Sequence, residues 1–367
     1  MPGVYLSYPF CAQKCTYCNF ASGVLPEALE RQYLGALSAE IAAVDWPWRP
    51  ETVYIGGGTP SRMELSDLNQ TFSGSGIPGA PWQEATIEVA PGTVTGERAA
   101  GWARAGLNRV SLGVQSFVQR ELARTGRKHT AEIVAHEVRV LRETGFANFN
   151  IDLIAGLPGQ TVAAWKESLE WIETLAPPHV SVYMLEIDDD SRLGHEVLLN
   201  GKRYGAPDVP ADELTAELYE IAASELDRMG IHRYEISNFA RPGFESLHNL
   251  KYWRLQPYLG FGADAHSFDG SMRSQNVESA ADYVDCWKRG QSPRLASTLA
   301  NRAEERFFVG LRLAEGIRPQ PEEWRRFEAP IQRFVDEGLL ASDGDRLRLT
   351  NRGVLLSNEV FAEFITI

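Results

Sequence analysis

The fold is decided by the stretch from Val4 to Cys18, which reads VYLSYPFCAQKCTYC. It opens with an apolar run of strand-forming residues, Val4–Tyr8, and passes directly into Cys11, Cys15 and Cys18. The spacing C-x3-C-x2-C in a chain with only four cysteines favours a metal site over a disulfide framework. The sequence therefore predicts three thiolates gathered in one loop at the carboxyl end of a strand.

The number of cysteines restricts the kind of metal. Structural zinc takes four Cys or His ligands, but the first histidine is His129 and the fourth cysteine is Cys286, both remote in sequence. A [4Fe–4S] cluster held by three thiolates keeps one iron open for chemistry. An incomplete zinc site and three inert buried thiols are the alternatives.

Strand-like and helix-like segments alternate six times after this opening. Parallel sheets are built from such βα units, so we expect a partial (βα)6 TIM-like barrel with functional residues at the carboxyl ends of its strands. The expected strands are Val4–Tyr8, Thr52–Ile55, Ala85–Val89, Arg109–Val114, Asn148–Ile154 and Val180–Leu185. The expected helices are Pro26–Val44, Thr95–Ala105, Thr130–Thr144, Thr161–Leu175 and Ala211–Met229.

The pattern changes after about residue 230, which predicts a division into residues 1–230, 231–300 and 301–367. In the middle part we expect a strand at Tyr234–Phe239, followed by an aromatic and glycine-rich stretch without a clear period. The last part reads as two helices, a hairpin and a final helix, the order of a winged-helix-like α+β domain. Its ten arginines against twelve acidic residues favour a partner-docking module over a DNA-binding one.

Composition excludes several classes of protein. The formal net charge of −13 argues against broad contact with nucleic acid. No apolar run approaches the length of a transmembrane helix, and the N-terminus lacks the features of a secretory signal. We therefore expect a cytoplasmic protein with reduced thiols and no transmembrane segment.

Four further groups follow the ends of expected strands. The glycine run Gly56–Pro60 (GGGTP) permits close backbone approach, Glu88 and Asp152 are acids among apolar residues, and Gln115 carries a neutral amide. The alternatives without a functional role are an ordinary turn for the glycine run and a solvent-facing strand position for Glu88. Burying Asp152 unpaired would cost several kcal/mol, so it needs a partner, either Arg127 or a cofactor.

The cysteine spacing, with Tyr17 just before the last cysteine, and the GGGTP run resemble the radical S-adenosylmethionine (SAM) superfamily. The resemblance implies a [4Fe–4S] cluster on Cys11, Cys15 and Cys18, with SAM chelating the fourth iron. Carried over residue by residue, it implies a SAM site made of Tyr5, Tyr17, Gly57, Gly58, Thr59, Glu88, Gln115, Arg127 and Asp152.

The whole chain resembles the branch that contains oxygen-independent coproporphyrinogen III oxidase and its heme-chaperone relatives (HemW). The oxidase has a fourth cysteine where this chain has Phe20, and a longer N-terminal extension; both departures favour the chaperones. The stretch from His248 to Trp253 (HNLKYW) matches the chaperones' HNxxYW motif. Histidine is a common axial ligand of heme iron, so the resemblance implies heme contact at or near His248, with His266 second.

The resemblance thus implies a heme chaperone that holds a cluster, SAM and heme and delivers heme to an acceptor protein. The oxidase of porphyrin biosynthesis is the alternative, and a radical SAM enzyme acting on another large planar substrate is a third possibility. The implied partners include a heme-accepting protein and an electron donor, neither identified by the sequence. From the residues alone, His248 caps a loop among core aromatics, and Cys286 is an inert core thiol.

Overall fold

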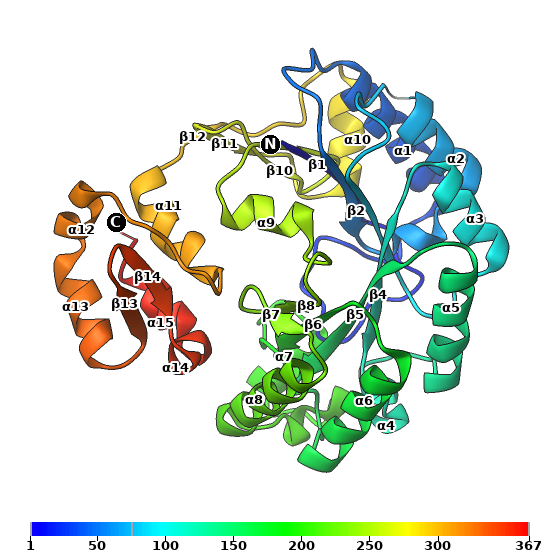
Figure 1. The fold of residues 1–367 in the computed structure, drawn as a ribbon. Coiled ribbons are helices and arrows are strands. Elements are labelled where there is room, and N and C mark those ends of the chain that lie inside the picture. The colour runs from blue at the N-terminus through cyan, green and yellow to red at the C-terminus, as the bar shows by residue number, and fades with distance from the viewer. Residues whose placement is uncertain (1, 75, 366–367) are drawn as a thin grey trace.

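The computed structural model describes residues 2–74 and 76–365. Figure 1 shows parallel strands at its centre with helices on their outer side, and six of them follow one another across the sheet in chain order. Helices join each strand to the next, which confirms the expected partial barrel. The six strands are β1 Gly3–Tyr8, β2 Thr52–Gly57, β3 Glu84–Val89, β4 Arg109–Gln115, β5 Asn148–Ala155 and β6 His179–Met184.

The helices form the outer layer. Three of them follow the first residues of expected helices, where the hydroxyls of Thr95, Thr130 and Thr161 accept hydrogen bonds from backbone N–H groups three residues later and cap the helix. Up to β7 the helical elements are α1 Glu27–Ala42, η1 Pro60–Arg62, α2 Leu65–Asn69, η2 Gln70–Gly74, α3 Gly96–Arg104, α4 Gln119–Arg124, α5 Ala131–Glu143, α6 Val162–Leu175, α7 Arg192–Leu198, η3 Arg203–Asp208 and α8 Asp212–Arg228.

Alternation along the strands separates the core from the barrel interior. Every second residue faces outward and is apolar and fully buried, as in Val4, Leu6, Val53, Ile55, Ile87, Val110 and Leu112. The residues between them face inward and are polar, as in Thr52, Tyr54, Glu88, Ser111, Asn150 and Asp152. The interior is therefore lined with groups that can bind polar ligands.

The sheet continues at both edges through the segment 231–300. β9 pairs parallel with β1 and is extended by three antiparallel strands, while β8 pairs antiparallel with both β6 and β7. The boundaries at residues 230 and 300 stay predictions. The added elements are β7 His232–Arg233, β8 Asn238–Ala240, α9 Leu247–Trp253, β9 Tyr258–Phe261, β10 His266–Phe268, β11 Met272–Gln275, α10 Ala280–Lys288 and β12 Thr298–Leu299.

The predicted continuous strand Tyr234–Phe239 is wrong, because the chain makes a tight turn there between β7 and β8. The Tyr234 N–H donates to the Asn238 carbonyl at 3.1 Å. The Glu235 carboxylate accepts from the Ser237 N–H at 3.2 Å and from the Asn238 side chain. Local bonds of this kind compete with an extended strand and close a hairpin instead.

The last part of the chain forms a small α+β unit whose order of elements agrees with the expected winged-helix-like arrangement. It packs on the barrel through the Arg312 guanidinium, which lies 5.0 Å from the Trp253 ring and 5.4 Å from the Phe361 ring. Its elements are α11 Arg302–Phe308, η4 Gly310–Arg312, α12 Pro321–Arg326, α13 Glu328–Asp336, β13 Leu340–Asp343, β14 Arg346–Leu349, α14 Asn351–Leu355 and α15 Ser357–Ala362. Among all the described residues, no helix is both long and apolar enough to span a bilayer.

Candidate iron–sulfur and S-adenosylmethionine site

The cysteine loop leaves β1 at its carboxyl end and is held by backbone hydrogen bonds. The Cys11 N–H donates to Gly23 at 2.8 Å, the Cys18 N–H to Cys15 at 3.4 Å, and the Thr16 N–H to Thr125 at 3.3 Å. The three thiols are free, with Cys11 buried and the other two half-buried. The loop therefore presents all three sulfurs at the end of the barrel where the strands finish.

The three thiols do not form a ligand set for a single metal ion. Within residues 2–74 and 76–365, no three Cys, His, Asp or Glu side chains converge as ligands of a single metal ion. A [4Fe–4S] cluster takes one thiolate on each of several irons, so its cysteines stand further apart than the ligands of a zinc ion. The loop is compatible with a cluster ligand set.

The glycine turn after β2 packs directly on this loop. The Gly58 N–H donates to Tyr8 at 2.7 Å, and the Thr59 N–H donates to Phe10 at 2.9 Å. A Cβ atom on Gly58 would lie 2.7 Å from the Phe10 carbonyl oxygen, and Gly57 has φ +111°. Only glycine fits such an approach, so the turn lies directly against the backbone that leads into the cysteine loop.

Glu88 joins the glycine turn to the interior. Its carboxylate accepts from the Gly57 N–H at 3.0 Å and from the Tyr54 hydroxyl at 2.9 Å. Burial raises the pKa of Glu88 to about 7, and the charge of Asp152 adds to the rise. A half-buried carboxyl group whose pKa lies near neutral pH is suited to bind an ammonium group or a pair of hydroxyls.

Gln115 carries an unsatisfied group and an unusual backbone. It ends β4 at φ +73°, beyond a register shift in the β4–β5 pairing, and its Oε1 is buried without a hydrogen-bond partner. Such strain and orphaned acceptors concentrate at functional sites, where a ligand supplies the missing donor. Arg127 lies nearby and donates to the Gly113 carbonyl at 2.6 Å and to the Tyr17 hydroxyl at 3.3 Å.

Asp152 has different partners from those expected. Its carboxylate accepts from Asn150 at 2.6 Å and from the Ser111 hydroxyl at 3.3 Å, whereas Arg127 makes no hydrogen bond to it. Burial raises the pKa of Asp152 despite these bonds. The hydrogen-bond partners of Asp152 are therefore Asn150 and Ser111, whereas Arg127, engaged by Tyr17 and a backbone carbonyl, interacts with Asp152 through its charge.

One end of the polar interior thus holds the glycine turn, Glu88, Gln115 and Asp152. Tyr5 lies with them and stacks on Tyr54, with 6.1 Å between the ring centroids. The Glu88 carboxyl and the orphaned Gln115 amide oxygen fit a molecule with ammonium and hydroxyl groups, as SAM has. The fit rests on the donor set and the unsatisfied Gln115 oxygen.

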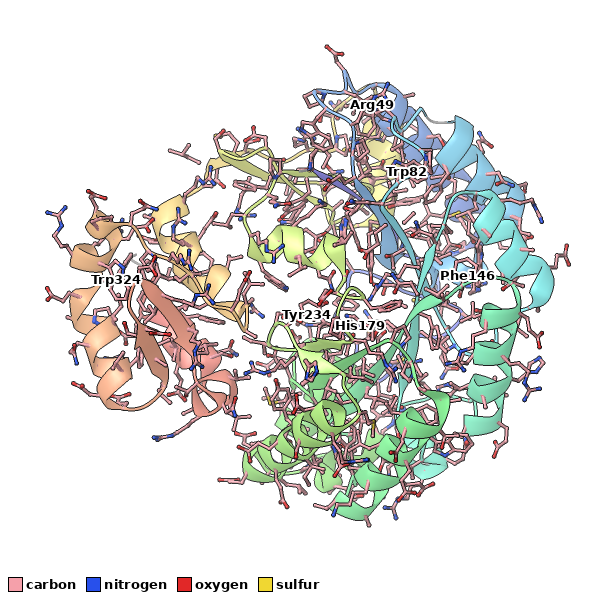
Figure 2. All side chains as sticks on the ribbon, in the orientation of Figure 1. Arg49, Trp82, Phe146, His179, Tyr234 and Trp324 are labelled. Atoms are coloured by element: carbon pink, nitrogen blue, oxygen red, sulfur yellow. The ribbon has the colours of Figure 1, made fainter. Side chains whose placement is uncertain are left out.

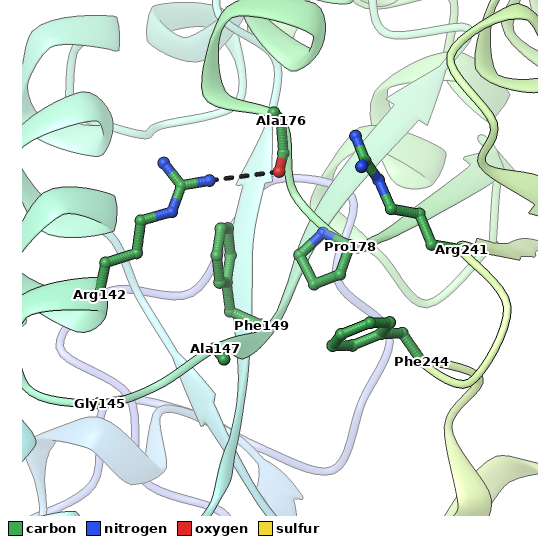
Figure 3. A pocket seen from close by; sticks show the side chains of 8 residues that line it. All are labelled: Arg142, Gly145, Ala147, Phe149, Ala176, Pro178, Arg241 and Phe244. Carbon is green, nitrogen blue, oxygen red and sulfur yellow. Dashed lines mark hydrogen bonds between the residues drawn. The ribbon is translucent and has the colours of Figure 1, made fainter.

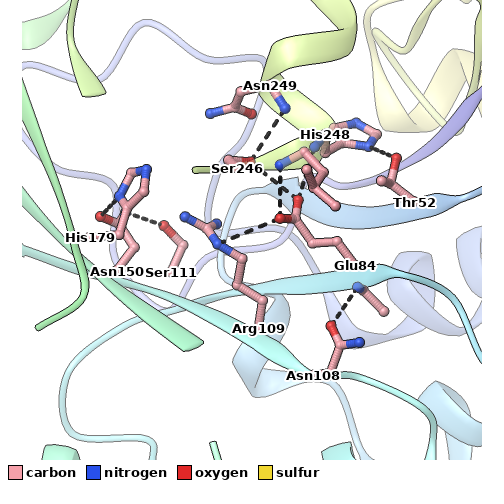
Figure 4. Close-up of polar contacts among 12 residues, drawn as sticks. Thr52, Glu84, Asn108, Arg109, Ser111, Asn150, His179, Ser246, His248 and Asn249 are labelled. Atoms are coloured by element: carbon pink, nitrogen blue, oxygen red, sulfur yellow. Dashed lines mark hydrogen bonds and ion pairs between the residues drawn. The ribbon is translucent and has the colours of Figure 1, made fainter. Parts of the chain in front are cut away.

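The opposite end of the barrel is closed by α9, and Figure 4 shows the contacts there. Glu84 accepts from the backbone N–H groups of Leu247 and His248, both at 2.9 Å, and lies 3.9 Å from the Arg109 guanidinium. Beside it, the His179 ring is hydrogen-bonded to Asn150 at 2.6 Å and to the Tyr234 hydroxyl at 2.9 Å. Figure 2 labels His179 and Tyr234 near the centre of the molecule. We call this layer the barrel floor.

His248 lies in the barrel floor and is 0% exposed. Its Nδ1 is hydrogen-bonded to the Thr52 hydroxyl at 2.8 Å and its Nε2 to the Tyr252 hydroxyl at 2.8 Å. Burial lowers the pKa of His248 to about 3, and the charges of Lys251 and Arg109 add to this. Heme ligation by His248 stays a prediction, and it would require breaking one of these two bonds and opening the floor.

The other two residues considered as ligands are remote from the cysteines in sequence. His266 is exposed at the start of β10. Cys286 is half-buried on α10, so its expected place in the core is wrong; the side chain sits on the partly exposed side of a surface helix.

Sequence reasoning missed Tyr54, Ser111 and Asn150, which hold Glu88 and Asp152, and it missed the floor residues Glu84 and Arg109. A signal for them exists in the alternation of polar and apolar residues along each strand. In a barrel covered by helices, the apolar set must face outward, which leaves the polar set inside.

The chain is similar to known proteins over its whole length. The radical SAM superfamily model matches residues 5–172, and the model of the HemN C-terminal domain matches residues 298–356. A protein named heme chaperone HemW from Bacillus subtilis is 34% identical, and the match covers 100% of this chain and 99% of that protein. The chain belongs to the HemW family of radical SAM proteins. This family implies a [4Fe–4S] cluster and SAM as cofactors.

Further relatives have the same breadth of match. Heme chaperone HemW from Escherichia coli is 34% identical over 99% of this chain and 97% of its own. A solved structure of coproporphyrinogen III oxidase (HemN) from Escherichia coli has a TM-score of 0.84 at 21% identity, covering 100% of this chain and 90% of the oxidase. At that identity the oxidase match shows the fold alone, and it confirms the predicted radical SAM architecture.

Proposed function

We propose that the protein is a heme chaperone, which binds a [4Fe–4S] cluster, SAM and heme and passes the heme to an acceptor protein. The observation that carries the proposal is similarity over the whole chain to proteins named heme chaperone HemW. The polar interior at the carboxyl ends of the strands supports the cofactor part. The reduced thiolates that a cluster needs favour the cytoplasm as its compartment.

In this proposal, Cys11, Cys15 and Cys18 hold three irons of the cluster. SAM lies on the glycine turn, with Glu88 and Gln115 beside its ammonium and ribose groups. When bound, the cluster supplies the electron that can cleave the sulfonium of SAM to a 5′-deoxyadenosyl radical. The remaining proposed SAM contacts are Tyr5, Tyr17, Gly57, Gly58, Thr59, Arg127 and Asp152.

Delivery of heme requires a surface for an acceptor protein, and reduction of the cluster requires an electron donor. The unit formed by residues 301–367 is our candidate for acceptor docking, because it is mixed in charge and carries none of the proposed cofactor residues. The HNxxYW motif stays a candidate heme contact, at the cost of opening the barrel floor.

Anaerobic titration of heme into the cluster-loaded protein, followed by its Soret absorption, tests the proposal. We expect saturable one-to-one binding and transfer of the bound heme to a heme-free acceptor enzyme. A parallel assay supplies coproporphyrinogen III, SAM and a reductant. Conversion of that substrate without heme binding would overturn the chaperone proposal in favour of the oxidase.

A further inference from the structure

Helix α7 is fastened to the cysteine loop. The Leu193 N–H donates to the Thr16 carbonyl at 2.8 Å, and the Asn19 side chain donates to Asp188, just before the helix, at 3.0 Å. Arg192 also donates to the Lys14 carbonyl. The helix and the loop therefore form one surface at the entrance to the proposed cluster site.

This surface exposes large apolar side chains. Phe20, at the end of the cysteine loop, is 66% exposed, and Leu198 and Leu199, at the end of α7, are 60% and 80% exposed. Val24 lies four residues beyond Phe20 and is also exposed. Exposed apolar residues that gather on two adjoining segments mark a binding surface more often than scattered ones do.

The same helix carries an imidazole with no assigned partner. His195 is exposed, and its ring makes no hydrogen bond or ion pair with any of the residues that the structure describes. It precedes Leu198 by three residues, so the two side chains lie on the same face of α7. An unengaged imidazole beside apolar side chains is suited to axial ligation of an iron porphyrin.

Two guanidinium groups lie together on the Tyr204 ring, which follows this helix. The guanidinium groups of Arg192 and Arg203 lie 5.5 Å and 5.1 Å from the Tyr204 ring, and Lys202 is exposed beside them. Arginine and lysine bind carboxylates, so these groups can pair with the propionates of a porphyrin. Imidazole, apolar residues and cations thus occur within one short segment, 192–204.

We propose that this surface, which we call the α7 face, binds heme, with His195 as an axial ligand of the iron. Leu198, Leu199 and Phe20 contact the macrocycle, and Arg192 and Arg203 pair with its propionates. The inference rests on the proposed function and adds the place of the heme to it.

Two other candidate heme sites lack a free axial ligand. The hollow of about 370 Å³ in Figure 3 has an apolar floor and two arginines, Arg142 and Arg241, but none of its lining residues carries an imidazole, thiol or thioether. His248 has an imidazole, but both of its nitrogens are bonded.

The test is heme titration of the cluster-loaded protein and of His195→Ala, with Soret position and spin state as readouts. We expect the variant to bind heme at least tenfold more weakly and to lose the axial imidazole signature. His232→Ala is the matched control, because that histidine is also exposed and bonds only to Asp227. Unchanged spectra and affinity in His195→Ala, with binding by the parent intact, would overturn the inference alone.

A second pair of variants separates the apolar contacts from iron ligation. Leu199→Asp should weaken binding of both heme and iron-free protoporphyrin, whereas His195→Ala should weaken only the heme. Leu299→Asp is the control, since Leu299 is 78% exposed on β12 at the far edge of the sheet. Equal loss in both aspartate variants would refute the α7 face, and no binding by the parent would overturn the chaperone proposal itself.

Discussion

Replacing His248 by alanine tests whether the HNxxYW motif builds the barrel floor. The ring lies between Tyr54 and Tyr252, with 5.2 Å between ring centroids on each side, and it bonds to two hydroxyl groups. Truncation leaves the hydroxyls of Thr52 and Tyr252 without these partners and opens a cavity at a fully buried position. The substitution therefore lowers the stability of the whole barrel.

The size of the effect follows from these contacts. Each buried group left unsatisfied costs about 1–3 kcal/mol, and the lost ring contacts add to it, unless water enters and replaces one bond. We expect His248→Ala to lower the free energy of unfolding by about 3–5 kcal/mol. That is a large part of the roughly 5–15 kcal/mol available to a typical protein of one domain.

Urea unfolding of the cluster-free protein, followed by tryptophan fluorescence, measures this difference. The exposed His232 provides the control, because His232→Ala removes only a surface pair and should stay within about 0.5 kcal/mol of the parent. If His248→Ala costs less than about 1 kcal/mol, the reasoning about the floor is refuted. Loss of heme binding without loss of stability would instead support His248 as an iron ligand.

Four further outcomes are expected. Cys18→Ala should abolish the iron–sulfur absorption of the reconstituted protein, and an intact spectrum would remove Cys18 from the ligand set. Glu88→Gln should weaken SAM binding about tenfold in calorimetry. In the parent, affinity should rise as the pH rises through about 7, because Glu88 is then ionised, and the variant should lack this dependence. Gly58→Ala should lower cluster loading, because the new Cβ would lie 2.7 Å from a backbone oxygen, whereas Gly35→Ala, with open space around it, should not. Finally, His248 stays neutral in the folded state down to about pH 3 but takes a proton below about pH 6.5 in the unfolded chain. This group's contribution to stability is thus complete above pH 6.5 and declines by roughly 1.4 kcal/mol per pH unit below it, so denaturation midpoints should fall with acidity and fall less in His248→Asn.

The six parallel strands could be predicted because each is a run of outward apolar residues bounded by turns. Strand ends then placed the glycine turn, Glu88, Gln115 and Asp152 together, since the carboxyl ends of parallel strands meet at one edge. The partners of those residues were not predicted. Asp152 is held by Asn150 and Ser111, a contact that depends on the register between β4 and β5.

The structure of the middle of the chain was harder to predict from the sequence, for a different reason. β9, β10 and β12 are two to four residues long, too short for a period to appear, and β9 pairs with β1, which is far away in the sequence. The same holds for α9, whose place is fixed by contacts to Glu84 and Thr52 that span 163 and 196 residues of sequence. Local pattern carries no information about such contacts.

The closed floor has a consequence for how ligands reach the interior. Because α9 covers the end where the strands begin, we expect a molecule the size of SAM to enter at the other end, past the cysteine loop. The α7 face borders that entrance through the Leu193–Thr16 bond. Heme bound there would lie beside the path of SAM, so each ligand should alter the affinity of the other by the same factor. A chaperone that holds both could in this way link release of its heme to the state of its cofactor site.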